Sequence, residues 1–225
     1  LLDPASRTRV QKIVGMFLYY ALAIDNTMLV ALGTIAGQQA HPTTATMAAA
    51  DWLLDYAATH PLAKIRYTAS DMQLYAHSDA SYLSEAHAHS RSAAYYYLSD
   101  KPLDPTQPPA TPPPLNGALH VVSKIMRNIV SLAAEAEIAA AYLTACKSVP
   151  IWTTLAELGH PQSPTPIQVD NTTCAGFAND TIKQKRTKSI NMNHYWLQDC
   201  TRLGQFLVYW RAGCTNYADY HTKHH

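Results

Sequence analysis

The spacing of the apolar residues changes near residue 65, and this change limits the fold more than any other feature of the sequence. Before it, apolar side chains recur at helical spacing in three segments, which span residues 7–23, 28–35 and 47–57. Asn26 and Thr27 can cap the second helix, and Thr43 or Thr44 can cap the third. The chain therefore begins with an all-helical part.

After the change, short runs rich in β-branched and aromatic residues alternate with helical stretches. The sequence predicts strands over residues 72–81, 90–98, 118–125, 166–170 and 205–211, and helices over residues 131–147, 171–179 and 188–203, with a closing helical turn over 217–223. Residues 151–158 can continue the first helix beyond Pro150, and residues 102–114, with seven of the 14 prolines, are predicted to form an exposed loop. Three successive strands followed by strands reached through helices indicate an α/β fold with a mixed sheet.

Composition excludes several classes of protein. The 225 residues carry 17 Lys and Arg against 16 Asp and Glu, and the net charge of +1 excludes the globally basic surface of a small nucleic-acid-binding domain. No apolar run approaches the roughly 18 residues of a membrane-spanning helix. The four cysteines lack the close spacing of a zinc site. Because the chain starts without Met and without a leader pattern, we expect an intracellular piece of a longer polypeptide.

Acidic residues stand at positions that this topology can bring together. They are Asp79 in the first strand, Glu135 and Glu137 at the start of the Ala-rich helix, Asp170 at the end of the fourth strand and Asp219 in the closing turn. Strand ends and first helical turns meet at one edge of an α/β sheet. Clustered carboxylates repel one another, and divalent metals such as Mg²⁺ relieve that repulsion. From spacing alone, scattered surface carboxylates remain the ordinary alternative.

Several motifs resemble, in the correct order, those of the ribonuclease H domain in copia-type LTR retrotransposon polyproteins. They are H-S-D-A-S-Y at residues 77–82, S-L-A-A-E-A-E-I at 131–138, V-D-N at 169–171, R-T-K-S-I-N-M at 186–192 and N-Y-A-D-Y-H-T-K at 216–223. Upstream, I-V-G-M-F-L-Y-Y at residues 13–20 is similar to the segment that follows the polymerase palm in these polyproteins. The chain has no polymerase Y-x-D-D motif of its own.

The resemblance implies a ribonuclease H-like, mixed five-stranded sheet, with three antiparallel and then parallel strands, flanked by helices. It divides the chain into a helical connection over residues 1–68 and a ribonuclease H-like domain over residues 69–225. It also implies a partner, the reverse transcriptase polymerase domain of the same polyprotein. The lack of a long apolar run adds the expectation of no association with a membrane. The implied location is the cytoplasm, which includes retroelement particles.

The same resemblance implies a metal-dependent endonuclease that hydrolyses the RNA strand of RNA/DNA hybrids during reverse transcription. The residues carried over as catalytic residues and metal ligands are Asp79, Glu137, Asp170 and Asp219. They would hold two Mg²⁺ ions, for which Mn²⁺ can substitute, in a two-metal-ion mechanism that leaves 5′-phosphate and 3′-hydroxyl ends.

Glu135 and Glu137 compete for one place in this set. Residues two apart on a helix point about 200° away from each other, so one site cannot take both side chains. In ribonucleases H the catalytic Glu precedes an apolar residue and then small residues, and Ile138 after Glu137 fits that pattern better. We therefore expect Glu137 to be the ligand and Glu135 to be a solvated charge near the helix N-terminus.

Substrate contacts are expected from two groups of residues. Four of them, Ser78, Ser81, Arg91 and Asn171, can contact phosphate or the 2′-hydroxyl groups of RNA. The other four, Lys183, Lys185, Arg186 and Lys188, can position a nucleic-acid backbone, although a solvated basic loop is an equally ordinary interpretation.

Some positions depart from the family pattern. Ala93 and Ala94 replace glycine, Leu132 replaces serine, and Asn191 replaces aspartate. The histidine that helps product leave in many cellular ribonucleases H is absent before Asp219, so His221 or His224 substitutes for it, or the assistance is missing. Two alternatives stay open: a decayed, non-catalytic connection and hybrid-binding module, and another nuclease of the ribonuclease H superfamily.

Overall fold

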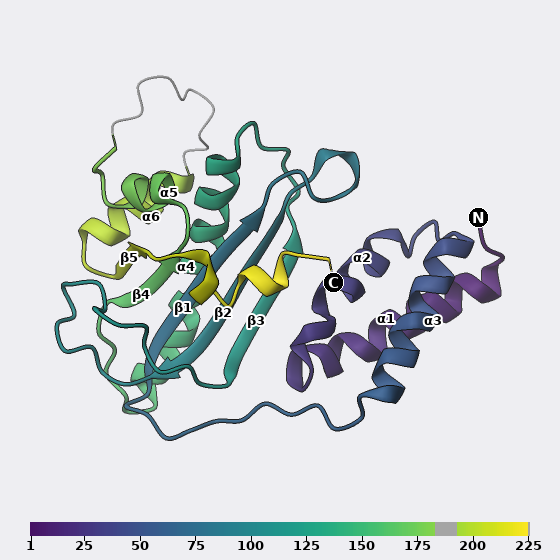
Figure 1. The fold of residues 1–225 in the computed structure, drawn as a ribbon, viewed down its shortest axis with the longest axis horizontal. Coiled ribbons are helices and arrows are strands. Elements are labelled where there is room, and N and C mark those ends of the chain that lie inside the picture. Colours follow the sequence, from purple (N-terminus) through teal and green to yellow (C-terminus); the bar gives the residue numbers. More distant parts are fainter. Residues whose placement is uncertain (183–192, 225) are drawn as a thin grey trace. The chain divides into compact units, whose positions relative to one another are not determined.

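The computed structural model describes residues 1–182 and 193–224. It divides into two compact units, one formed by Leu1–Ile65 with Lys223–His225 and the other by Arg66–Thr222 (Figure 1). The domain division expected at residue 68 stays a prediction. The predicted basic contacts Lys183, Lys185, Arg186 and Lys188 lie outside the described residues. No helix within the described ranges has the length and apolar character needed to cross a membrane.

Three helices form the first unit: α1 (Pro4–Ala23), α2 (Leu29–Gln38) and α3 (Thr44–Thr59). A short 3₁₀ turn, Asn26–Met28, leads into α2. Its cap is Asp25, whose carboxylate accepts hydrogen bonds from the Thr27 N–H at 3.2 Å and hydroxyl at 2.5 Å. The predicted caps Asn26 and Thr27 are wrong, because both residues lie within the 3₁₀ turn, and α2 begins after Met28 without a side-chain cap. Thr43 caps α3 as predicted.

The second unit contains a five-stranded sheet. Its strands are β1 (Gln73–Ser81), β2 (Arg91–Ser99), β3 (Ala118–Ile125), β4 (Thr165–Val169) and β5 (Phe206–Trp210). They lie in the order β3-β2-β1-β4-β5, with β1, β2 and β3 antiparallel and β1, β4 and β5 parallel (Figure 1). The predicted mixed sheet, with three antiparallel strands followed by parallel strands, is confirmed.

Helices α4 (Ala133–Glu157), α5 (Thr172–Ala178) and α6 (Asn193–Arg202) pack against the sheet. The core between sheet and helices contains Leu74, Ala76, Tyr96, Ile138, Ile167, Phe177, Leu197 and Val208. Alternate residues of β1 enter this core, since successive side chains of a strand point to opposite faces. His77 and Asp79 therefore lie on the opposite face of β1 from Leu74 and Ala76.

Helix α4 is continuous through Pro150, so residues 151–157 extend the helix as the sequence analysis allowed. Proline removes the backbone donor that would bond the Cys146 carbonyl one turn back, and the helix nevertheless continues to Glu157. Gly159 follows with φ +92°, which ends the helix as predicted. The proline-rich residues 102–114 form neither helix nor strand, as expected.

The chain after β5 crosses back over the sheet. Figure 1 shows this segment, in yellow, passing over β1 and β2, and its 3₁₀ turn Asp219–His221 contacts both strands. The closing helical turn predicted over residues 217–223 is this shorter 3₁₀ turn. The segment brings the last acidic residue of the chain to the first strand of the sheet.

Candidate metal centre

Three of the predicted acidic residues converge at one end of the sheet. Asp79 lies near the end of β1, Glu137 near the start of α4, and Asp170 directly after β4. Strands β1 and β4 run parallel with His77 opposite Gln168, so the positions two residues further on are neighbours. One carboxylate oxygen from each acid lies within 4.8 Å of the other two. The topology thus brings together residues that are separated widely in the sequence.

Burial makes this carboxylate group electrostatically unfavourable without a cation. Asp79 is 4% exposed and Glu137 is 9% exposed. Burial, followed by the negative charges of Asp79 and Asp170, raises the pKa of Glu137 to about 9, although a backbone hydrogen bond from Ala80 opposes the rise. The Glu137 Oε2 atom is buried and has no hydrogen-bond partner among the described residues. An oxygen-only, negatively charged and desolvated group fits a divalent metal such as Mg²⁺.

Asp219 stands apart from this three-carboxylate group. It is the first residue of its 3₁₀ turn, is partly buried, and does not belong to the set of oxygens within 4.8 Å of one another. Its charge still acts on the group, because it contributes to the raised pKa of Glu137. The neighbouring acid Glu135 has another environment: its Oε2 accepts a hydrogen bond from the Ser131 N–H at 2.8 Å.

Three residues that the sequence analysis did not single out fix the acids in place. The Trp210 indole N–H donates to the Asp170 carbonyl at 2.9 Å, and the Thr222 hydroxyl donates to Asp79 Oδ2 at 2.5 Å. Gly213 lies so close to Asp170 that an added Cβ would stand 2.9 Å from its Oδ2. Of these three residues, Thr222 is the one that lies in a motif found in the sequence, as the threonine of the terminal motif at residues 216–223.

Two of the predicted substrate contacts are buried. Ser78 and Arg91 are both 0% exposed. The Arg91 Nε donates to Glu85 Oε1 at 2.6 Å, and its NH1 group donates to Ser123 Oγ at 3.1 Å. A side chain enclosed in this way has no surface to offer a nucleic acid, so the placement of Ser78 and Arg91 speaks against direct contact.

The other two described candidates are partly exposed and lie beside the acids. Ser81 closes β1, and its hydroxyl is 2.6 Å from that of Ser84. Asn171 follows Asp170 and caps α5, because its Oδ1 accepts from the N–H groups of Thr173 and Cys174. The Asn171 side chain therefore orients the chain directly after Asp170, whatever else it contacts.

The two histidines considered for product release differ in exposure. His221 is 3% exposed, and its ring stacks on Tyr95 with a centroid distance of 6.2 Å. His224 is exposed. A histidine that moves with product needs room to move, and His221 does not have it.

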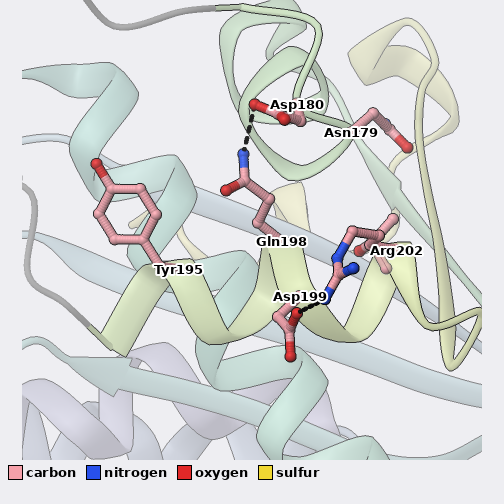
Figure 2. Close-up of a pocket in the computed structure, with 7 residues that line it drawn as sticks. Asn179, Asp180, Tyr195, Gln198, Asp199 and Arg202 are labelled. Carbon is pink, nitrogen blue, oxygen red and sulfur yellow. Dashed lines mark hydrogen bonds and ion pairs between the residues drawn. The ribbon is translucent and has the colours of Figure 1, made fainter.

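Apart from the carboxylate group, a hollow lies between the end of α5 and helix α6 (Figure 2), with a volume of about 580 Å³. Its charged groups already have partners: Gln198 donates to Asp180 at 3.2 Å, and Arg202 donates to Asp199 at 2.5 Å. None of the four predicted acidic ligands lines it. The carboxylate group is the better candidate for a functional site.

No family model matches this chain, and no curated protein matches it. Solved structures that resemble it include ribonuclease H domains. The N-terminal RNase H domain of Rv2228c from Mycobacterium tuberculosis, solved as a fusion with maltose-binding protein, is 13% identical, with 66% of this chain and 88% of that chain covered and a TM-score of 0.41.

LC11-RNase H1 in complex with an RNA/DNA hybrid is 9% identical, with 65% of this chain and 91% of that chain covered and a TM-score of 0.44. The protease–reverse transcriptase of Prototype Foamy Virus is 14% identical and has a TM-score of 0.39, with 68% of this chain but only 20% of that chain covered. At these identities and TM-scores, the likeness says nothing about activity or substrate.

Proposed function

We propose that the chain is a metal-dependent ribonuclease H that hydrolyses the RNA strand of RNA/DNA hybrids. The observation that carries this proposal is the group of buried Asp79, buried Glu137 and partly buried Asp170, in which one carboxylate oxygen of each residue lies within 4.8 Å of the others. A folded protein rarely assembles three such charges at a strand end without a counterion, since each charge raises the cost of the others.

Asp79, Glu137 and Asp170 would hold the metal, and Asp219 would complete the set from the turn that crosses β1. Two Mg²⁺ ions, or Mn²⁺ in their place, would supply charge stabilisation for phosphodiester hydrolysis and a water that is easily deprotonated. Burial of the carboxylates strengthens their attraction for a cation, because the local dielectric constant is lower than that of water. Glu137 must release its proton when it binds the metal, and its carboxylate then faces two others that the metal neutralises.

The remaining chain would position the hybrid and link the nuclease to its polyprotein. Ser81 and Asn171 flank the carboxylate group and are partly exposed, so they are the described residues best placed to meet the RNA backbone. The basic residues at 183–188, which lie outside the described residues, would hold phosphates of the nucleic-acid backbone. The terminal motif and the helical unit fit a copia-type retroelement, in which residues 1–68 connect this domain to a reverse transcriptase polymerase domain in the cytoplasm.

Incubation of the chain with a hybrid labelled on either strand tests this proposal. In Mg²⁺ we expect the RNA strand of the hybrid to be cut into products with 5′-phosphate and 3′-hydroxyl ends. The DNA strand and single-stranded RNA should survive. Asp79→Asn should abolish the cleavage and leave binding of the hybrid intact. If the wild-type chain binds the hybrid in Mg²⁺ and Mn²⁺ but leaves its RNA strand whole, the chain is a non-catalytic binding module and the proposal fails.

A further inference from the structure

The segment from residue 215 to residue 222 is fastened to the sheet by side-chain hydrogen bonds. The contacts join Gln168 to the Thr215 hydroxyl, Asn216 to the Ser78 carbonyl, His77 Nδ1 to the Tyr217 N–H, Ser123 to the His221 carbonyl, and Thr222 to Asp79, at distances between 2.5 and 3.0 Å. Most of these residues are buried. The segment is therefore docked by specific polar contacts.

Thr222 is the member of this set that contacts an acid of the carboxylate group. It is 1% exposed, and its hydroxyl donates to Asp79 Oδ2 at 2.5 Å across 143 residues of sequence. The same hydroxyl is 2.9 Å from the carbonyl oxygen of Asp219. One side chain thus touches the first predicted ligand and the backbone of the last.

The chemistry of the hydroxyl group decides which contact dominates. A threonine hydroxyl has one hydrogen, and both neighbouring oxygens are acceptors, so it can donate to only one of them at a time. The shorter contact is to the carboxylate, and hydrogen bonds to ionised groups are the stronger kind.

We infer that Thr222 is a positioning residue of the metal centre: its hydroxyl orients the Asp79 carboxylate and ties to it the turn that carries Asp219. This inference rests on the proposed function, because it assigns a role toward the metal that the carboxylates would hold. Side chains that bond to metal ligands fix the orientation of those ligands, and their loss typically lowers metal affinity or activity by 10–100-fold.

Three variants of the full chain separate this role from a structural one. Thr222→Val keeps the shape of the side chain and removes the hydroxyl, whereas Thr222→Ser keeps the hydroxyl. Thr153→Val is the matched control, because among the described residues its hydroxyl bonds the Val149 carbonyl within α4. Isothermal titration with Mn²⁺ alone gives the affinity of each variant, circular dichroism gives its fold, and hybrid cleavage gives kcat and KM.

We expect Thr222→Val to bind Mn²⁺ about tenfold more weakly or worse, with a lower kcat and an unchanged KM for the hybrid. Thr222→Ser should restore the wild-type affinity, and Thr153→Val should keep it. Equal Mn²⁺ affinity in wild type and Thr222→Val, or an equal loss in Thr222→Ser, overturns the inference while the proposed function stands. If Thr222→Val does not fold, Thr222→Ala replaces it with the same expected results. A wild-type chain that binds no Mn²⁺ overturns the proposed function itself, and this inference with it.

Discussion

The structure buries glutamates in two places that have opposite surroundings. The side chain of Glu85 is 5% exposed and pairs with the guanidinium of Arg91, whose side chain is 0% exposed. Glu137 is 9% exposed, and the charges that act on it are carboxylates. The first pair is neutral as a unit, while the second group gathers like charges.

The difference teaches which kind of buried acid marks a functional site. A buried ion pair satisfies its own charges, so its presence needs no ligand and its removal damages the fold. A buried group of like charges is unfavourable in the fold and becomes favourable only when a cation arrives. Perturbed acids of the second kind are typical of functional sites, because the same arrangement that costs stability creates affinity. The four predictions that follow test this contrast.

The largest effect on stability should come from breaking the ion pair. Arg91→Met leaves Glu85 buried without its partner, and we expect the free energy of unfolding to fall by about 3–5 kcal/mol. Arg202→Met is the control, since it breaks the exposed pair with Asp199 and should cost less than about 1 kcal/mol. Urea denaturation measures both. Equal losses in the two variants would show that the buried pair does not contribute as described.

The largest effect on activity should come from the carboxylate group. Glu137→Gln removes a proposed ligand, and we expect the cleavage rate to fall more than about a hundredfold, since even loss of an outer partner costs 10–100-fold. Glu135→Gln is the matched control from the same helix, because Glu135 bonds the Ser131 N–H and should be dispensable for cleavage. Initial rates on a labelled hybrid in Mg²⁺ decide between the two. An inactive Glu135→Gln beside an active Glu137→Gln would reverse the assignment.

The like-charge group should make metal-free stability fall as pH rises. Folding raises the pKa of Glu137 from its ordinary 4.5 to about 9, so between these values the folded chain holds a proton that the unfolded chain has released. This contribution is fully present below pH 4.5 and is lost as pH rises through 9, at no more than about 1.4 kcal/mol per pH unit. The glutamine variant lacks it. In EDTA, urea denaturation of Glu137→Gln minus wild type should therefore give a difference that grows from pH 5 to pH 8, and a constant difference would contradict the assigned pKa.

A smaller effect should follow from crowding Asp170. Gly213→Ala places a Cβ 2.9 Å from Asp170 Oδ2, so the carboxylate or the turn must shift, and we expect cleavage to fall about tenfold. Gly15→Ala is the control, because nothing lies within 4 Å of a Cβ added there. Steady-state rates at saturating Mg²⁺ compare them. An unchanged cleavage rate in Gly213→Ala would show that the reaction does not depend on the present position of the Asp170 carboxylate.

The fold could be predicted from the spacing of the apolar residues, because a strand or helix that buries one face keeps that spacing whatever it packs against. The strands β1 to β5 were placed within about two residues, and the order of hairpin strands followed by crossover strands set the sheet. Local caps were harder to predict. Asn26 and Thr27 are good caps in general, but it is Asp25 that caps the 3₁₀ turn, since its carboxylate accepts from the Thr27 N–H. Pro150 likewise lies inside a continuous helix, because a helix can lose one backbone hydrogen bond and still continue.

At the site, the sequence could identify acids but not their surroundings. Arg91 was predicted to contact the substrate, because a lone arginine in a strand gives no indication of its partner. That partner, Glu85, lies in the loop between β1 and β2. The hydrogen bond of Thr222 to Asp79 and the close approach of Gly213 to Asp170 join segments that are distant in the sequence, so no local pattern reveals them. To predict such pairs, one must know how β1, β4 and the last segment of the chain are aligned with one another.

Diffraction from crystals soaked in Mn²⁺ tests the central claim most directly, because anomalous scattering locates the ion without reference to activity. The account predicts Mn²⁺ bound by carboxylate oxygens of Asp79, Glu137 and Asp170, with metal–oxygen distances near 2 Å. In crystals of Glu137→Gln this density should weaken or vanish. A carboxylate group that stays without metal at millimolar Mn²⁺, or an ion held instead by Asp180 and Asp199, would contradict it.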